Sequence, residues 1–389
     1  MQIDPADIAI CVTDEEAGGP LAPVPTSAPI VQTSLFSFPT FGALVDAFKA
    51  EHRHNVYTRG QNPTVQAFEH KLAALERGEA CKCFASGMAA ISAVMLGLLR
   101  SGDHVLFVNQ TYGPTLQLAE HLRRFGIEHD SVLDLEVDSV ERGIRPNTRL
   151  IWLESPGTML LRVLDLGAVT AFARQRSILT CVDNSWATPL CQKPLAAGAD
   201  IVVHTCSKYL GGHSDVIAGG VVSTAERIQE LFYSTFLLHG GVLGPFDAWL
   251  LLRGLRTLPV RLRQHESDAL EVARFLSTHS AVQRVHHPAF AESTDLVQSQ
   301  LTGYSGLFSF ELADGDFESV SRVIDGLAHF RIGVSWGGVE SVVISPNRGT
   351  NGPQLDAQEI PRGLIRLSVG LEGPDVLIED LASALAGAR

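Results

Sequence analysis

Between about residue 64 and residue 254, short apolar segments alternate with amphipathic ones, and this alternation limits the fold more than any other feature. The short segments are apolar at consecutive positions, as strands buried on both faces are. Such strands, separated by helices, form a parallel sheet that is covered on both sides. The sequence therefore predicts an α/β fold, with strands at 81–84, 104–108, 150–153, 179–182 and 201–204 and helices at 65–75, 88–99 and 116–125.

The pattern changes after residue 254, where long helical segments at 262–278 and 317–330 separate a few strands, such as 307–312 and 364–369. This spacing predicts a smaller α+β domain. The first 55 residues have no strong repeating pattern and contain many prolines, so we interpret them as an arm that contacts another subunit. The expected units are the arm (1–55), a large domain (56–254) and a C-terminal small domain (255–389).

The composition is that of an ordinary globular enzyme, with 45% apolar and 19% charged residues in a chain of 389. A formal net charge of -13 argues against nucleic-acid binding, which needs clustered lysine and arginine. No run of about twenty apolar residues is present, so no membrane span is expected. The first residues lack a basic and then apolar leader, and we expect a cytoplasmic location.

The cysteines favour a structural role over a metal site. No CxxC pair occurs, and we expect the thiols of Cys81 and Cys83 on opposite faces of a strand, which makes zinc improbable. Several cysteines lie in apolar segments, where a free thiol behaves as a small core residue. The six positions are Cys11, Cys81, Cys83, Cys181, Cys191 and Cys206.

Polar and small residues follow the ends of the predicted strands. Ligands of open α/β sheets bind at the carboxyl ends of the strands, so these residues are the candidates for a site. Each has a plainer interpretation when taken singly: Ser86-Gly87 as a common turn, Asp183 as a helix cap, and Lys208 as a solvated charge. The residues collected in this way are Ser86, Gly87, Met88, Tyr112, Glu154, Asp183, Thr205, Ser207 and Lys208.

Together these residues match what pyridoxal phosphate (PLP) requires. The cofactor acts as an electron sink whose pyridine nitrogen must stay protonated, and Asp183 is the candidate carboxylate for that proton. Lys208 is predicted to form the Schiff base and then to move protons, and Tyr112 to stack on the ring and to take part in proton transfer as a second catalytic residue. The phosphate is expected at the helix that opens with Gly87 and Met88, beside the hydroxyls of Thr205 and Ser207.

One segment of this chain, SKYLGGHSD at 207–215, resembles the lysine motif of the Cys/Met-metabolism PLP enzymes. That family includes cystathionine β-lyase, cystathionine γ-synthase, cystathionine γ-lyase and methionine γ-lyase. The resemblance extends over nearly the whole chain, through YTRGQNPT (57–64), ASGMAA (85–90), VDNSWATP (182–189) and LIRLSVGLE (364–372). It implies a PLP fold-type I (aspartate-aminotransferase-like) subunit, with a mixed, mostly parallel sheet, in a homotetramer whose active sites are each shared by two chains.

The resemblance also implies roles for residues outside the predicted strand ends. Tyr57 and Arg59 resemble the pair that reaches across the dimer to the cofactor phosphate of the other chain. Arg366 resembles the residue that pairs with the substrate carboxylate. Ser335 and Trp336 resemble the loop beside that arginine.

The member of the family that the chain resembles most is cystathionine β-lyase. Trp336, Pro114 and the segment Glu154-Ser155-Pro156-Gly157 match the β-lyase pattern, whereas Val334 and Gly113 depart from it. The expected reaction is β-elimination of L-cystathionine to homocysteine, pyruvate and ammonia. The alternatives are γ-elimination or γ-replacement of the γ-lyase and γ-synthase type, and a specialised carbon–sulfur lyase or transferase. A non-catalytic PLP-binding regulator would carry a DNA-binding segment, and residues 1–55 have no helix-turn-helix pattern.

Overall fold

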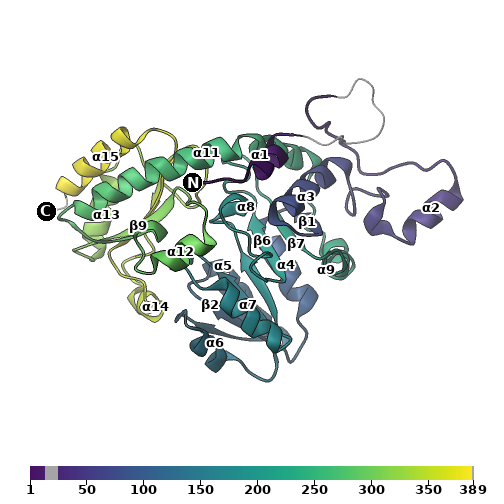
Figure 1. Cartoon of the computed structure of the whole chain (residues 1–389), viewed down its shortest axis with the longest axis horizontal. Helices are drawn as coiled ribbons and strands as arrows, with labels where there is room; N and C mark the ends of the chain where they lie inside the picture. Colours follow the sequence, from purple (N-terminus) through teal and green to yellow (C-terminus); the bar gives the residue numbers. More distant parts are fainter. Residues whose placement is uncertain (14–24, 388–389) are drawn as a thin grey trace.

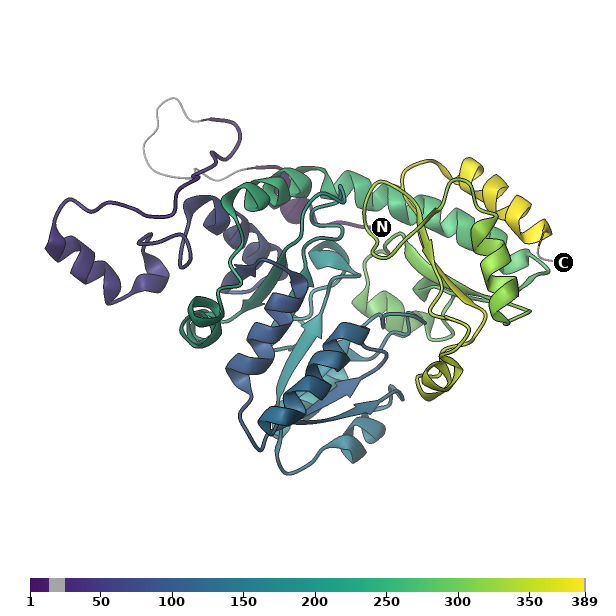
Figure 2. The same cartoon turned by 180° about the vertical axis from the view of Figure 1, so that it is seen from behind.

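A computed structural model describes residues 1–13 and 25–387. It contains two sheets, each with its own helices, joined by one long helix (Figure 1). The large sheet has the strand order β1-β7-β6-β5-β4-β2-β3, and the smaller sheet has the order β10-β11-β12-β9-β8. Figure 2 shows the same arrangement from behind, with the small sheet and the C-terminal helix on one side.

The strands of the large sheet are β1 (Ala80–Phe84), β2 (His104–Val108), β3 (Glu128–Val132), β4 (Thr148–Glu154), β5 (Leu179–Asp183), β6 (Ile201–Thr205) and β7 (Gly219–Ser223). The small sheet consists of β8 (Val282–His286), β9 (Leu307–Leu312), β10 (Arg331–Ile332), β11 (Val342–Ile344) and β12 (Leu364–Ser368).

The α-helices are α1 (Pro5–Val12), α2 (Phe41–Phe48), α3 (Pro63–Glu76), α4 (Gly87–Leu98), α5 (Gly113–Leu122), α6 (Val137–Gly143), α7 (Leu166–Gln175), α8 (Thr188–Cys191), α9 (Ala225–Leu231), α10 (Leu237–His239), α11 (Pro245–Thr278), α12 (Thr294–Gln300), α13 (Phe317–Asp325), α14 (Gly352–Ala357) and α15 (Pro374–Ala386). One π-turn, Phe232–Phe236, joins α9 to α10.

The large sheet is mixed and mostly parallel, as predicted. Strands β3, β2, β4, β5 and β6 pair in parallel, and β7 is antiparallel to both β6 and β1. Helices cover both faces: Val203 and Val221 pack in the same apolar cluster as α4, while Val202 and Val222 pack with Leu72 of α3. Because the parallel strands end at one edge, the residues that follow them are brought together there.

In the large sheet, strands β3 and β7 were not predicted, and neither were the two N-terminal helices α1 and α2. Strand β3 is the edge of the sheet, and its sequence Glu-His-Asp-Ser-Val is too polar to resemble a buried strand. Within the expected arm, α1 packs against α3 and α11, and the N-terminal ammonium lies 2.8 Å from Glu266 Oε2. Helix α2 projects from the body with Phe41 80% exposed, so only part of the segment has the form of an arm (Figure 1).

Helix α11 is 34 residues long and contacts both halves of the chain: α3 in the large unit and β8, β9 and α15 in the small one. Its sequence contains Pro259, and the predicted helix began only at residue 262, with no element predicted for the residues before it. The predicted boundary between residues 254 and 255 therefore falls inside a continuous helix. The division into units stays a prediction.

The expectation for Cys81 and Cys83 was wrong. Both thiols lie on the same face of β1, with their sulfurs 3.8 Å apart, because residues two apart in a strand point the same way. All six cysteines are free and buried. Within residues 1–13 and 25–387, no group of three or more histidine, cysteine or acidic side chains is arranged to hold a metal ion. The helices of that same part of the chain include none that is both long and apolar enough to cross a membrane.

Candidate active site

Lys208 lies directly after β6, at the edge where the parallel strands end. Its Nζ donates a hydrogen bond to Ser335 Oγ at 2.6 Å and lies 5.4 Å from the centre of the Trp336 ring. Ser335 has a φ of 83° and Gly337 a φ of 85°, and a Cβ at Gly337 would lie 2.8 Å from the backbone nitrogen of Tyr209. The loop between β10 and β11 therefore approaches the lysine closely only with glycine at position 337.

Burial and the nearby Arg366 lower the pKa of Lys208 to about 8, against an opposite effect of Asp183. A lysine with this pKa is partly neutral at physiological pH, whereas an ordinary lysine is almost fully charged. Only the neutral amine can attack a carbonyl carbon or accept a proton. The site thus prepares Lys208 for nucleophilic and base chemistry.

This environment predicts an unusually reactive lysine in the cofactor-free protein. Acylation of Lys208 by an amine-directed reagent is expected to rise with pH with a midpoint of about 8. Arg366→Gln is expected to move that midpoint upward, because the guanidinium lowers the pKa of Lys208. Peptide mass spectrometry after short labelling at several pH values measures both midpoints, with Lys49, an exposed lysine directly after α2, as the internal control. Equal midpoints for Lys208 and Lys49 would contradict this description of the site.

Asp183 ends β5, the strand that pairs with β6, after which Lys208 lies. Its Oδ1 accepts hydrogen bonds from the Ser185 hydroxyl at 2.6 Å and the Ser185 backbone N–H at 3.0 Å. The Ser185 hydroxyl in turn accepts one from the Thr205 N–H at 2.7 Å. Burial raises the pKa of Asp183, while Ser185, His204 and Lys208 lower it. A carboxylate so placed suits the protonated nitrogen of a pyridine ring.

The start of α4 provides a place for a phosphate. The hydroxyl of Ser86 accepts a hydrogen bond from Ala89 N at 3.0 Å, and the N–H groups of Gly87 and Met88 belong to the first turn, which has no intrahelical acceptors. A Cβ on Gly87 would collide with Thr205 Oγ1, so glycine keeps the space between the helix and the end of β6 open. The hydroxyl of Ser207 accepts a hydrogen bond from Ala218 N at 2.9 Å. Helix dipole, first-turn amides and hydroxyls together fit a phosphate group.

Tyr112 precedes α5, and its backbone N–H donates to Glu154 Oε2 at 2.8 Å. Burial, Asp183 and Glu154 raise the pKa of Tyr112, and Arg366 lowers it. Glu154 received no role from sequence, although it ends β4 opposite Asp183 in the sheet. Burial raises the pKa of this carboxyl well above its usual range, which favours the neutral acid. Its position at a strand end had placed it among the candidate residues, but without a function.

Arg366 lies in the middle of β12, in the small sheet, and it points to the same group of residues. Burial lowers its pKa, and interactions with Tyr112 and Glu154 raise it. The two sheets therefore meet at this site: the large sheet contributes Lys208, Asp183 and Tyr112, and the small one contributes Arg366. An arginine in this position is suited to a carboxylate, which it binds through two parallel hydrogen bonds.

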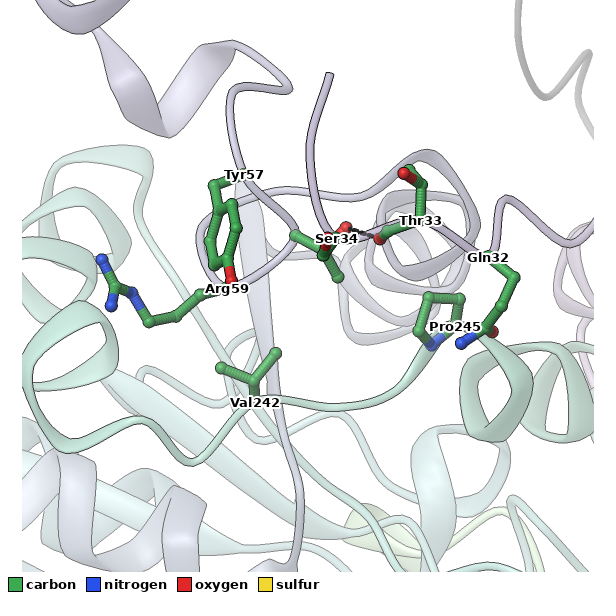
Figure 3. A pocket seen from close by; sticks show the side chains of 8 residues that line it. Gln32, Thr33, Ser34, Tyr57, Arg59, Val242 and Pro245 are labelled. Carbon is green, nitrogen blue, oxygen red and sulfur yellow. Dashed lines mark hydrogen bonds between the residues drawn. The ribbon is translucent and has the colours of Figure 1, made fainter.

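Tyr57 and Arg59 do not join this group within one chain. They line a separate pocket of about 500 Å³ with Gln32, Thr33, Ser34, Thr58, Val242 and Pro245 (Figure 3). The Arg59 guanidinium lies 5.7 Å from the centre of the Tyr57 ring, and Tyr57 is 46% exposed. In Figure 3 the Arg59 side chain extends away from the other lining residues.

Comparison with known proteins assigns the chain to a family. The model of the Cys/Met metabolism PLP-dependent enzymes matches residues 19–386. The chain belongs to this family. It is 40% identical over 379 residues to a cystathionine gamma-lyase of Bacillus subtilis, covering 96% of each protein, and 37% identical over 366 residues to a cystathionine beta-lyase of Lactococcus lactis, covering 92% of this chain and 93% of the relative.

Among solved structures, the fold is similar to that of the cystathionine gamma synthase of Xanthomonas oryzae in complex with cystathionine. The TM-score is 0.90 at 34% identity, and the similarity covers 98% of both chains. The fold-type I architecture and the dependence on PLP that the sequence predicted are therefore confirmed. Membership of this family places the enzyme in cysteine and methionine metabolism, and the names of its relatives include both lyases and a synthase, which differ in the bond that they break or form.

Proposed function

We propose that this enzyme is a carbon–sulfur lyase that carries out β-elimination on L-cystathionine and releases homocysteine, pyruvate and ammonia. The observation that supports this most directly is the convergence of one amine, Lys208, one phenol, Tyr112, and one guanidinium, Arg366, around Asp183. An α,β-elimination needs one base, one acid for the leaving sulfur and one anchor for the substrate carboxylate. These three side chains meet that need.

Bound PLP supplies an electron sink that stabilises negative charge at the substrate Cα. In the proposed reaction, Arg366 holds the α-carboxylate and Ser335 orients the Lys208 amine through their hydrogen bond. Lys208 Nζ accepts the Cα proton, and its lowered pKa keeps part of the amine neutral and able to do so. Tyr112 keeps its proton because its pKa is raised, and it donates that proton to the sulfur as the C–S bond breaks. Water then converts the three-carbon fragment to pyruvate and ammonia.

The products identify the reaction. Purified protein with PLP and L-cystathionine is expected to give homocysteine and pyruvate in equal amounts, measured by mass spectrometry. Cysteine and 2-oxobutyrate instead would show γ-elimination. Cystathionine formed from an O-activated homoserine and cysteine would show γ-replacement. Either result overturns the proposed β-elimination while leaving the family assignment intact.

A second candidate is γ-elimination from cystathionine, and the 40% identity to the Bacillus subtilis cystathionine gamma-lyase favours it. This reaction needs a further deprotonation at Cβ, so the same amine would have to act twice. Val334, 78% exposed beside Ser335, offers no carboxylate at that position. The product assay separates the two candidates.

We further propose a homo-oligomer, built as a dimer of dimers, in which Tyr57 and Arg59 complete the phosphate site of a neighbouring chain. Their exposure and their separation from Lys208 within one chain support this arrangement. Each of two facing chains would supply its own Tyr57 and Arg59 to the active site of the other. The arginine fork would then bind the phosphate with two hydrogen bonds.

Mixing two inactive proteins tests the shared site. Chains carrying Tyr57→Ala and Arg59→Ala, mixed with Lys208→Ala chains, are expected to recover about a quarter of the parental activity, because random pairing gives one intact site in half of the dimers. Mass-tagged chains verify subunit exchange, and each protein alone is the control. No recovery after verified exchange would count against sharing.

The cytoplasm stays our proposal for the location. Six free, buried cysteines suit a reducing compartment. Cell fractionation followed by immunoblotting tests it.

A further inference from the structure

A pair of ionisable side chains lies on the far side of the large sheet from the cofactor face. Glu76 ends α3 and His204 lies in β6, and both side chains are 0% exposed. The His204 Nε2 is hydrogen-bonded to Glu76 Oε1. His204 follows Val203 in the strand and faces α3, as Val202 does, whereas Asp183 has the same orientation as Cys181, towards the α4 side.

Burying such a pair is costly. Removing two groups that can carry charge from water requires strong compensation, and an apolar pair of similar volume is often as stable or more stable. Here the compensation is incomplete: in the part of the chain that the structure describes, Glu76 Oε2 and His204 Nδ1 have no hydrogen-bond partner. Packing alone does not account for this pair, and its position relative to Asp183 suggests a role.

The pair is connected to Asp183 by two routes through the backbone. Asn184, the next residue, donates its Nδ2 hydrogen to Glu76 Oε1 at 2.7 Å, and its backbone N–H bonds to Val203 O at 3.0 Å. On the other side, Thr205 follows His204 and donates its N–H to the Ser185 hydroxyl, which bonds to Asp183 Oδ1 at 2.6 Å. Both neighbours of His204 in the strand thus hold the loop that carries Asp183.

We propose that Glu76 and His204 form a positioning pair behind Asp183. The pair orients the Asp183 carboxylate through Asn184 and Ser185, and its imidazole favours the charged form of that carboxylate. Neither residue touches the cofactor site itself. Glu76 fixes the ring of His204, and the ring lies one strand away from the carboxylate, since Asp183 pairs with Val203. His204 lowers the pKa of Asp183, against the effect of burial. The inference rests on the proposed role of Asp183 beside the pyridine nitrogen.

Other groups act on the same carboxylate, and the test must keep them unchanged. Ser185 and Lys208 favour its charged form, together with His204. Glu154 of β4 and the phenol of Tyr112 act on it from the cofactor side, and the thiols of Cys181 and Cys206 act on it from within the sheet. Near Glu76, Lys193 and Arg77 both form ion pairs with Asp7.

The experiment compares four variants of the full chain: His204→Gln, the double variant Glu76→Gln with His204→Gln, Asp183→Asn and His104→Gln. The double variant removes both members of the pair together, so it avoids the buried carboxyl without its imidazole partner that the single variant creates. His104 is the matched control, because it is 0% exposed and bonded to Thr148 Oγ1 at 2.8 Å, but lies at the opposite end of the sheet. Thermal melting of each cofactor-free protein measures the general cost of losing a buried histidine.

The readouts are the dissociation constant of PLP and the pH dependence of the absorbance of the bound cofactor. Both His204 variants are expected to weaken PLP binding about tenfold, as loss of an outer-shell partner does for other bound groups. The acid-side midpoint of the absorbance change is expected to move to higher pH, because without His204 the pKa of Asp183 rises and the carboxylate is lost earlier on acidification. His104→Gln is expected to lower the melting temperature without changing either readout.

The outcomes distinguish a failure of the positioning pair from a failure of the proposed role of Asp183. If Asp183→Asn leaves PLP binding and absorbance unchanged, the proposed role of Asp183 fails. If Asp183→Asn changes both and the folded double variant changes neither, the positioning pair alone is refuted. If His204→Gln does not fold, the double variant decides. If His104→Gln changes both readouts as much as the His204 variants do, the effect reflects a general loss of stability, and the proposal is overturned.

Discussion

Lys208→Ala is expected to reduce turnover of every amino-acid substrate by more than about 10⁴-fold, because one side chain acts as both nucleophile and base. The burial and the guanidinium that lower its pKa to about 8 serve both tasks. Alanine removes the amine and leaves Ser335 Oγ without the donor 2.6 Å away. Lys208→Arg is expected to be equally inactive, because a guanidinium neither links to the cofactor aldehyde nor accepts a proton near pH 7.

Turnover, absorbance of the bound cofactor and borohydride reduction followed by peptide mapping check this expectation. The parent protein should carry the reduced cofactor on the peptide that contains Lys208, and both variants should lack it. Lys193→Ala is a suitable control, since Lys193 pairs with Asp7 at 2.8 Å, outside the site, and Asp7 keeps Arg77 as a partner. A labelled peptide that does not contain Lys208 would remove the basis of the proposed mechanism.

Arg366→Ala is expected to lower kcat/KM by about 100-fold, mainly through KM, while cofactor absorbance is unchanged. The substrate carboxylate would lose a partly buried, charged hydrogen-bond partner, which costs about 3 kcal/mol. Arg366→Lys should recover only part of the loss, because an ammonium lacks the planar fork that binds both carboxylate oxygens. Steady-state kinetics on L-cystathionine measure both values.

An amine substrate without the α-carboxylate provides the control for this prediction. The parent and Arg366→Ala should process it at similar low rates, since it offers the arginine nothing to bind. A 100-fold loss on that amine as well would place Arg366 in a different role. One such role is support of Tyr112, whose phenol it influences.

The sequence predicted most of the large sheet because its strands are buried on both faces. Strands β2, β4, β5 and β6 are continuous apolar segments and were found within a residue or two. Strand β3 was missed because an edge strand with Glu128 and Asp130 partly in water has no reason to be apolar. Strand β7 begins Gly219-Gly220, where a Cβ would collide with Ser86 and Leu72, so close packing excluded the side chains that favour strands.

The site was predictable to the extent that it follows from strand ends. Asp183 and Lys208 follow parallel neighbours, so chain order alone brings them together. Glu154 also lies at the end of a parallel strand, but the cofactor nitrogen needs only one carboxylate and Asp183 already provided it. No role for a neutral carboxyl was considered. His204 lay inside the apolar segment Ile-Val-Val-His-Thr, where a buried histidine was the available signal. Arg366 belongs to another sheet, and only the resemblance to a family connected it to the site.

Helix α11 has a consequence for the engineering of this enzyme. At about 50 Å long, this helix acts as a rod shared by both sheets. Within it, Gly254 lies where a side chain would collide with the backbone of Leu210 and Gly211, two and three residues after Lys208. A chimera in which the small unit of a relative replaces that of this chain from residue 254 would join two halves of α11 from different proteins. The junction would lie against the segment that follows Lys208. A junction after Thr278, where the rod ends, would keep the whole rod and its packing behind Lys208, and would exchange Arg366 together with the Ser335 loop that contacts the amine.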